Sequence, residues 1–143
     1  IPKIGVLGIG CRRGTSAAQL EAAFAQFCAA HGLAAVCITA AASIDLKADE
    51  PGLLEFCRIH GWPVQFYSAA QLQNVPGQFT PSAFVRSVTG VDNVCERAAM
   101  KAANEEGTFI LRKQAENGIT IAIVKYDWKL ERELAKEYRI DEQ

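Results

Sequence analysis

The residues best suited to hold a charged ligand lie in one short segment, GIGCRRGTS, between an apolar run and a helical pattern. Glycines let a backbone approach a ligand closely, and a helix N-terminus favours anions through its free N–H groups and dipole. Two adjacent arginines add forked donors that fit carboxylate or phosphate. We expect an anion-binding loop; the alternative is a tight turn whose arginines face solvent. The predicted binding residues are Gly8, Gly10, Cys11, Arg12, Arg13, Gly14, Thr15 and Ser16.

A second candidate segment is SIDLKADEPG, which begins at Ser43 after the second apolar run. Ligands of open α/β sheets bind beyond the carboxyl ends of the strands, where this segment is expected to lie. Lys47 is predicted to hold an anionic substrate, and Asp45 is predicted to act in proton transfer. The alternative is a solvated loop in which Asp49 caps the next helix.

A third candidate is Glu96, which falls in the first or second turn of a predicted helix. The local pattern by itself favours stabilisation of the helix dipole, typically about 0.3–1 kcal/mol. Further along the chain, at least one of Arg112, Lys113 and Lys125 is expected to line a site from the last two strands.

The spacing of Gly8, Gly10 and Gly14 also resembles a dinucleotide-binding pattern, GxGxxxG. Such a site needs an acidic residue at the end of the second strand to bind the ribose. That strand is expected to end in Thr39 and alanines, and Asp45 lies several residues further on. A nucleotide-binding oxidoreductase module is therefore a weakened hypothesis.

The elements that must position these residues alternate between strands and helices. Ser16 and Gln19 form a plausible capping box for the first helix, and Asp92 or Asn93 is expected to cap the helix that carries Glu96. We expect strands at 3–10, 33–39, 63–67, 108–112 and 119–125, and helices at 16–32, 49–61, 68–74, 80–90 and 92–104.

This alternation predicts an α/β fold, a three-layer α/β/α sandwich with helices on both faces of the sheet. The turn Glu116-Asn117-Gly118 predicts a final antiparallel hairpin, which makes the sheet mixed, though mainly parallel. Residues 1–126 are expected to form this domain, and the charged residues 127–143 a helical tail.

Bulk composition excludes several classes of protein. The chain has 143 residues and a net charge of -1, and this balance argues against nucleic-acid or membrane-surface binding. Its five cysteines include no CxxC pair and are expected to stay reduced, and its two histidines each precede a helix-ending glycine, so a metal site is not expected. No apolar run approaches the roughly 18 residues of a membrane span. With no signal peptide expected either, we predict a cytoplasmic protein.

Three segments, LGIGCRRGTS, IDLKADEPGLLEF and VCERAA, resemble in order and spacing the CobE/CbiG C-terminal domain of cobalamin biosynthesis. The resemblance covers Lys3 to about Tyr126 and implies the same three-layer fold. In this family, the two-domain cobalt-precorrin-5A hydrolase opens a ring δ-lactone and releases acetaldehyde. The chain matches only the C-terminal part of that enzyme, or a stand-alone CobE-like protein.

The resemblance also implies roles for individual residues. Glu96 is expected to be the general base, with Asp45 as the second acid or base. The Gly8–Ser16 loop, assisted by Lys47, is expected to clamp the acetate and propionate groups of a corrinoid substrate. No cofactor or metal of the protein's own is implied, because any cobalt travels with the substrate. The implied partners are a preceding CbiG N-terminal domain or other pathway enzymes; the alternative function is a non-catalytic corrinoid binder or carrier.

Overall fold

Five strands form one mixed sheet at the centre of the molecule, which is described by a computed structural model for residues 4–33, 37–81, 86 and 88–126. The strand order is β3-β2-β1-β5-β4. The first three strands are parallel to one another, and β5 runs antiparallel to both β1 and β4. The strands are β1 (Ile4–Cys11), β2 (Cys37–Ile44), β3 (Val64–Tyr67), β4 (Thr108–Glu116) and β5 (Ile119–Tyr126).

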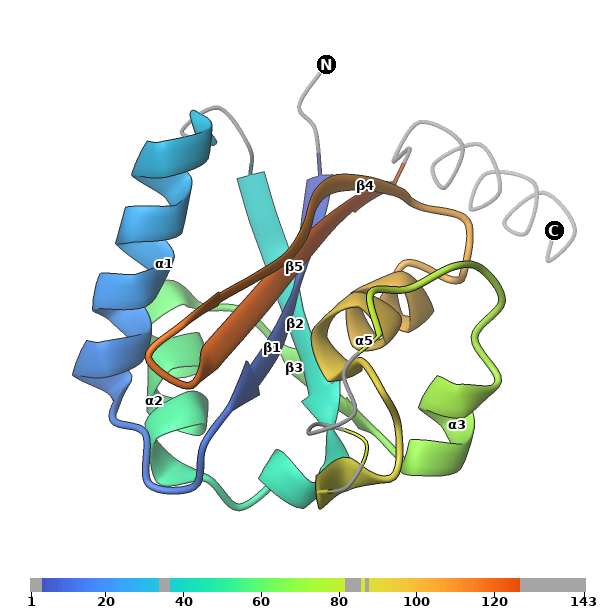
Figure 1. Cartoon of the computed structure of the whole chain (residues 1–143). Coiled ribbons are helices and arrows are strands. Elements are labelled where there is room, and N and C mark those ends of the chain that lie inside the picture. Colours follow the sequence, from blue (N-terminus) through green and yellow to red (C-terminus); the bar gives the residue numbers. More distant parts are fainter. Residues whose placement is uncertain (1–3, 34–36, 82–85, 87, 127–143) are drawn as a thin grey trace, which may run out of the picture.

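Helices cover both faces of this sheet (Figure 1). One face carries α1 (Ala17–His31) and α2 (Pro51–His60), and the other carries α3 (Ala69–Gln73) and α5 (Val94–Ala102). Alternate residues of β1 supply the two cores: Leu7 packs in the cluster beneath α1 and α2, and Val6 in the cluster beneath α5. The predicted α/β/α sandwich with a mixed sheet is confirmed.

Local sequence signals fix most of the helix ends. Ser16 and Gln19 make the predicted capping box, and α1 ends at Gly32 in the left-handed conformation. Asn93 accepts a hydrogen bond from the Glu96 backbone N–H and so caps α5, as one of the two alternatives predicted. The cap predicted at Asp49 is wrong: Glu50 occupies the N-cap position of α2, and its side chain makes no capping hydrogen bond.

The second strand lies further along the chain than predicted. The second strand was predicted to end at Thr39 and residues 40–49 to be irregular, but residues 40–44 belong to β2, although alanine is depleted in strands. Pairing with β1 overrides this propensity, since Ala41 and Ala42 lie opposite Leu7 and Gly8. The irregular segment is therefore shorter than predicted, and a 3-10 turn (Asp45–Lys47) follows the strand directly.

The final hairpin has the predicted antiparallel pairing, and Asn117 and Gly118 both adopt positive φ in its two-residue turn. Strand β4 extends beyond the predicted residue 112, and two register shifts against β5 accompany its bend. Residues 82–85 and 87 of the helix predicted at 80–90, and the whole predicted tail at 127–143, lie outside the described residues. No helix in the described part of the chain is long and apolar enough to cross a membrane.

Candidate functional site

The loop after β1 and the 3-10 turn after β2 lie at the same end of the sheet, beyond the carboxyl ends of the parallel strands (Figure 1). The predicted start of this loop at Gly8 is wrong, because β1 continues to Cys11. A Cβ atom at Gly8 would lie 1.8 Å from the backbone oxygen of Cys95, so this glycine lets α5 approach the sheet. Gly8 therefore serves helix packing, and the exposed loop begins only after Cys11.

Most backbone N–H groups of the loop are already used within the protein. The N–H of Arg12 donates to the Gly118 carbonyl, and the N–H of Gly14 donates to a carboxylate oxygen of Glu50. The next two N–H groups also have internal acceptors: Thr15 donates to the Arg12 carbonyl, and Ser16 donates to Gln19 Oε1. The loop therefore differs from a phosphate-binding loop, whose free N–H groups face the ligand. Anion binding here depends on side chains.

The side chains available for that task are the two arginines. Arg12 and Arg13 are both exposed. The Arg12 side chain lies beside Gly118 in the β4–β5 turn, where a Cβ would be 2.7 Å from Arg12 Nε. The Arg13 guanidinium lies 3.9 Å from Glu50 Oε1, too far for a hydrogen bond. Both guanidinium groups can thus donate hydrogen bonds to a ligand carboxylate without breaking a strong internal contact.

Glu50 anchors this loop from the start of α2, a role that sequence reasoning missed. Its side chain is only 3% exposed, and its Oε2 accepts the N–H of Gly14 at 3.1 Å. The first turn of α2 also packs closely against this loop, because a Cβ at Gly52 would lie 1.9 Å from the Thr15 carbonyl oxygen. The available sequence signal was a glutamate immediately before a helix-opening proline.

Cys11 and Lys47 lie in the same neighbourhood as Glu50. Burial raises the pKa of the Cys11 thiol, the nearby Lys47 ammonium lowers it, and the Glu50 carboxylate raises it again. The net direction is upward, so Cys11 is a neutral thiol near pH 7 rather than a reactive thiolate. The structure therefore brings together the predicted residues Cys11, Arg13 and Lys47. Asp45 is exposed in the 3-10 turn that also carries Lys47.

Glu96 belongs to a different part of the molecule. It is fully buried in α5, and its carboxylate accepts hydrogen bonds from the Thr80 N–H at 2.8 Å, the Asn93 amide at 2.9 Å and the Lys113 N–H at 2.7 Å. The Thr80 hydroxyl donates to it as well, at 3.0 Å. Both oxygens are thus occupied, and the carboxylate joins α5 to β4 and to the segment around Thr80.

No described hydrogen bond or ion pair connects Glu96 with residues 11–16. The expected convergence of Glu96 with the glycine loop is therefore not seen as direct contact. For a proton to reach Glu96, one of its four donors must be displaced. Its assignment as general base stays a prediction, and the geometry gives it a structural task instead.

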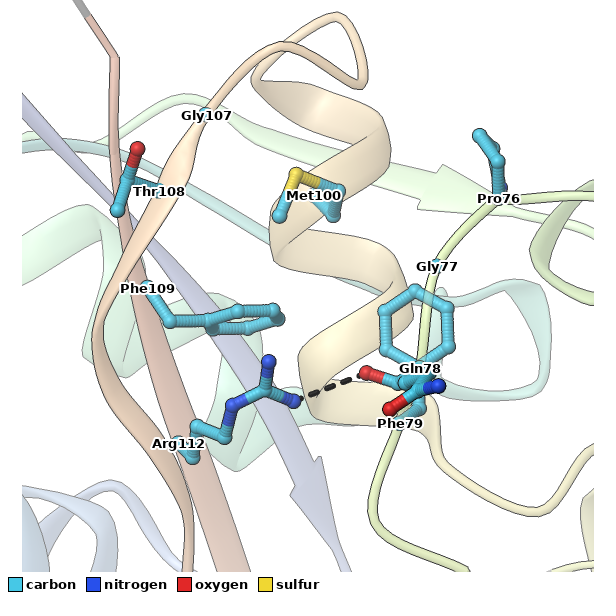
Figure 2. A pocket seen from close by; sticks show the side chains of 9 residues that line it. All are labelled: Pro76, Gly77, Gln78, Phe79, Met100, Gly107, Thr108, Phe109 and Arg112. Carbon is cyan, nitrogen blue, oxygen red and sulfur yellow. Dashed lines mark hydrogen bonds between the residues drawn. The ribbon is translucent and has the colours of Figure 1, made fainter.

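A cavity of about 400 Å³ lies on the α5 face of the sheet, between α5, β4 and the segment before Thr80. Figure 2 shows Phe79, Phe109 and Met100 around it, with Arg112 at one end. The Arg112 guanidinium lies 4.4 Å from the Phe109 ring centre and donates to the Gln78 carbonyl at 2.9 Å. Arg112, one of the three basic residues expected to line a site, lines this cavity, whereas none of the loop residues does. That the cavity is a functional site stays a prediction.

Metal-ligating side chains do not gather in the described part of the chain: no three of its His, Cys, Asp and Glu residues are placed to hold an ion. Cys11, Cys28, Cys57 and Cys95 are free thiols. Burial raises the pKa of Cys57 to about 11 and that of Cys95 to about 12. The absence of a cofactor stays a prediction.

Comparison with known proteins gives a consistent picture. The chain is 35% identical over 127 residues to the cobalt-precorrin-5A hydrolase of Priestia megaterium, covering 88% of this chain but only 34% of that protein. It is 34% identical over 119 residues to protein CobE of a Sinorhizobium species, covering 82% of this chain and 77% of CobE.

A solved structure agrees with these relatives. The crystal structure of CobE, a protein of the cobalamin (vitamin B12) biosynthetic pathway, matches with a TM-score of 0.77 and 35% identity, covering 89% of this chain and 93% of that one. The chain spans about a third of the hydrolase it matches and most of CobE. The model of the family described as cobalamin synthesis G C-terminus matches residues 5–124, and the chain therefore belongs to this family.

Proposed function

We propose that this chain binds a polycarboxylate corrinoid intermediate of cobalamin biosynthesis and takes part in its δ-lactone opening, the reaction of a cobalt-precorrin-5A hydrolase. The observation that carries the proposal is the pair of exposed guanidinium groups, Arg12 and Arg13, at the carboxyl end of the central parallel strand. Lys47 adds a third cation in the same neighbourhood. Adjacent cations suit a ligand with several acetate and propionate groups.

The chemistry needs an activated water, donors for the developing oxyanion and a group that removes the proton of the released alcohol. Arg12, Arg13 and Lys47 supply charge for the substrate carboxylates, and Asp45, which is exposed in the same 3-10 turn as Lys47, is the candidate for proton transfer. Acetaldehyde release sends its electron pair into the conjugated macrocycle, so the substrate supplies that sink. Any cobalt is carried by the corrinoid.

A non-catalytic corrinoid binder or carrier is the second candidate. The observation that favours it is the short match to the hydrolase relatives, because the chain spans about a third of their length. A partner domain, such as the remainder of a hydrolase, or another pathway enzyme then completes the catalytic machinery. The nucleotide hypothesis is weakened further, because the loop N–H groups that a pyrophosphate needs are used internally.

The test is binding of cobalt-precorrin-5A to the purified chain, followed by measurement of acetaldehyde. We expect micromolar binding that weakens at least tenfold in Arg12→Ala/Arg13→Ala, with acetaldehyde released by the wild type. The control is Arg58→Ala, which removes an exposed arginine of α2 that pairs with Glu55 rather than with the loop. Binding that is equal in all three proteins would contradict the role of the loop, and binding without acetaldehyde would favour the carrier.

A further inference from the structure

Glu50 is unusual among the buried polar side chains that the structure describes. Its Oε1 is the one buried side-chain nitrogen or oxygen in that part of the chain without a hydrogen-bond partner. A buried carboxylate oxygen normally finds a donor, because leaving it unpaired costs free energy. Sites that bind or transform a ligand are one place where proteins keep such groups.

The position of this oxygen points toward the loop. Oε2 of the same carboxylate is anchored by the Gly14 N–H, which fixes the direction of Oε1. The Arg13 guanidinium of the loop lies 3.9 Å from Oε1, and the Arg13 side chain is 75% exposed. A solvent-facing side chain that is suited to bind a ligand carboxylate therefore lies close to Oε1.

A substrate carboxylate bound by the Arg13 guanidinium would bring the substrate close to Oε1. Lys47 and Glu50 both lie close enough to Cys11 to change the pKa of its thiol, Lys47 by lowering it and Glu50 by raising it. Oε1 thus lies among the groups proposed to hold the corrinoid. Glu96 lacks these properties, since all its accepting positions are engaged by protein donors.

We propose that Glu50 is a catalytic residue of this site, whose Oε1 takes the proton of the water that opens the substrate lactone. The inference rests on the proposed function and deepens it. The water oxygen bonds to the lactone carbonyl carbon as its proton passes to Oε1. The ring C–O bond then breaks, and Glu50 returns the proton to the departing alkoxide. The product carries a new carboxylic acid and a hydroxyl group, and Glu50 ends as the carboxylate it began.

The test compares Glu50→Gln, Glu50→Asp and wild-type chain with cobalt-precorrin-5A as the substrate. Gln retains an oxygen for the Gly14 N–H but cannot accept the proton, so we expect kcat to fall at least a hundredfold while corrinoid affinity changes less than threefold. Asp retains the base on a shorter stem and is expected to recover part of kcat. As the pH is lowered, protonation of the base should reduce kcat/KM. We expect this decrease to persist in Glu50→Asp and to be absent from the residual activity of Glu50→Gln.

The matched control is Glu55→Gln on the same helix, because Glu55 pairs only with exposed Arg58 among the described residues. It should retain wild-type turnover. An active wild type together with a Glu50→Gln variant of similar kcat would overturn the role of Glu50 and leave the proposed function standing. A wild type that binds corrinoid but releases no acetaldehyde would overturn both the hydrolysis and the catalytic role. Equal melting temperatures of the variants exclude misfolding as the cause of lost turnover.

Discussion

Glu50 and Glu96 are both buried near the first turn of a helix, yet the hydrogen bonds of their carboxylates differ. Glu96 in α5 is fully buried, and four donors satisfy its carboxylate. Glu50 at the start of α2 is nearly as buried, but only Oε2 has a hydrogen-bond partner among the described residues. A buried acid whose oxygens are all bonded holds structure together, whereas one with an unpaired oxygen retains the capacity to act on a ligand. Burial alone therefore does not identify the reactive group.

The largest expected effect is a difference in the free energy of unfolding between alanine variants of these two glutamates. Glu96→Ala leaves the donors of Thr80, Asn93 and Lys113 unpaired inside the protein, so we expect the free energy of unfolding to fall by about 3–5 kcal/mol. Glu50→Ala removes one hydrogen bond and one unpaired oxygen, so the expected loss is about 1 kcal/mol. Urea denaturation of the two variants beside the wild type measures both values. Equal losses would contradict the contrast between a structural and a reactive glutamate.

Much of the fold could be predicted from the sequence because its signals are local. The capping box at Ser16 and Gln19, the helix-ending Gly32 and the Asn117-Gly118 turn each depend on neighbouring residues. The second strand was misplaced because its alanines carry no strand signal, and only pairing with β1 makes residues 40–44 extended. Long-range pairing of that kind has no local trace.

The candidate site was less predictable for the same reason. Sequence reasoning selected the arginines by their chemistry, and the structure places Arg13 and Lys47 in the neighbourhood of Cys11 and Glu50. It could not show that Gly14 donates to Glu50, which lies 36 residues away, or that four donors saturate Glu96. The glycines were the hardest residues to interpret, because a sequence does not distinguish a glycine that binds a ligand from one that allows close packing.

The second prediction tests whether Gly8 is needed for the close packing of α5 against the sheet. A Cβ there meets the Cys95 backbone 1.8 Å away, and a backbone carbonyl cannot rotate aside. We expect Gly8→Ala to lower the free energy of unfolding by about 3 kcal/mol. Gly10→Ala is the matched control: its Cβ meets the Thr120 hydroxyl at 2.5 Å, and this side chain can turn away, so the loss should stay below about 1 kcal/mol. Thermal or urea unfolding that ranks the two equally would refute the packing role of Gly8.

The smallest expected effect reports on the charge of Glu50 through a neighbouring thiol. The pKa of Cys11 is raised by burial and by the Glu50 carboxylate, and lowered by Lys47. Glu50→Gln removes one raising cause, so the thiolate forms at lower pH and alkylation by iodoacetamide becomes faster at a given pH. Lys47→Ala should move the profile the opposite way.

Glu96→Gln is the control for that shift, because Glu96 acts on Cys95, whose pKa burial raises to about 12. Peptide mass spectrometry measures the alkylation rate of each cysteine from neutral to alkaline pH. Cys95 should remain slow throughout in the wild type, and the Cys11 profile should be the same in Glu96→Gln and wild type. If the pH dependence of Cys11 alkylation were unchanged in Glu50→Gln but shifted in Glu96→Gln, the assignment of the two glutamates would be reversed. The direction of each shift thus tests, without any substrate, which acid lies at the arginine loop.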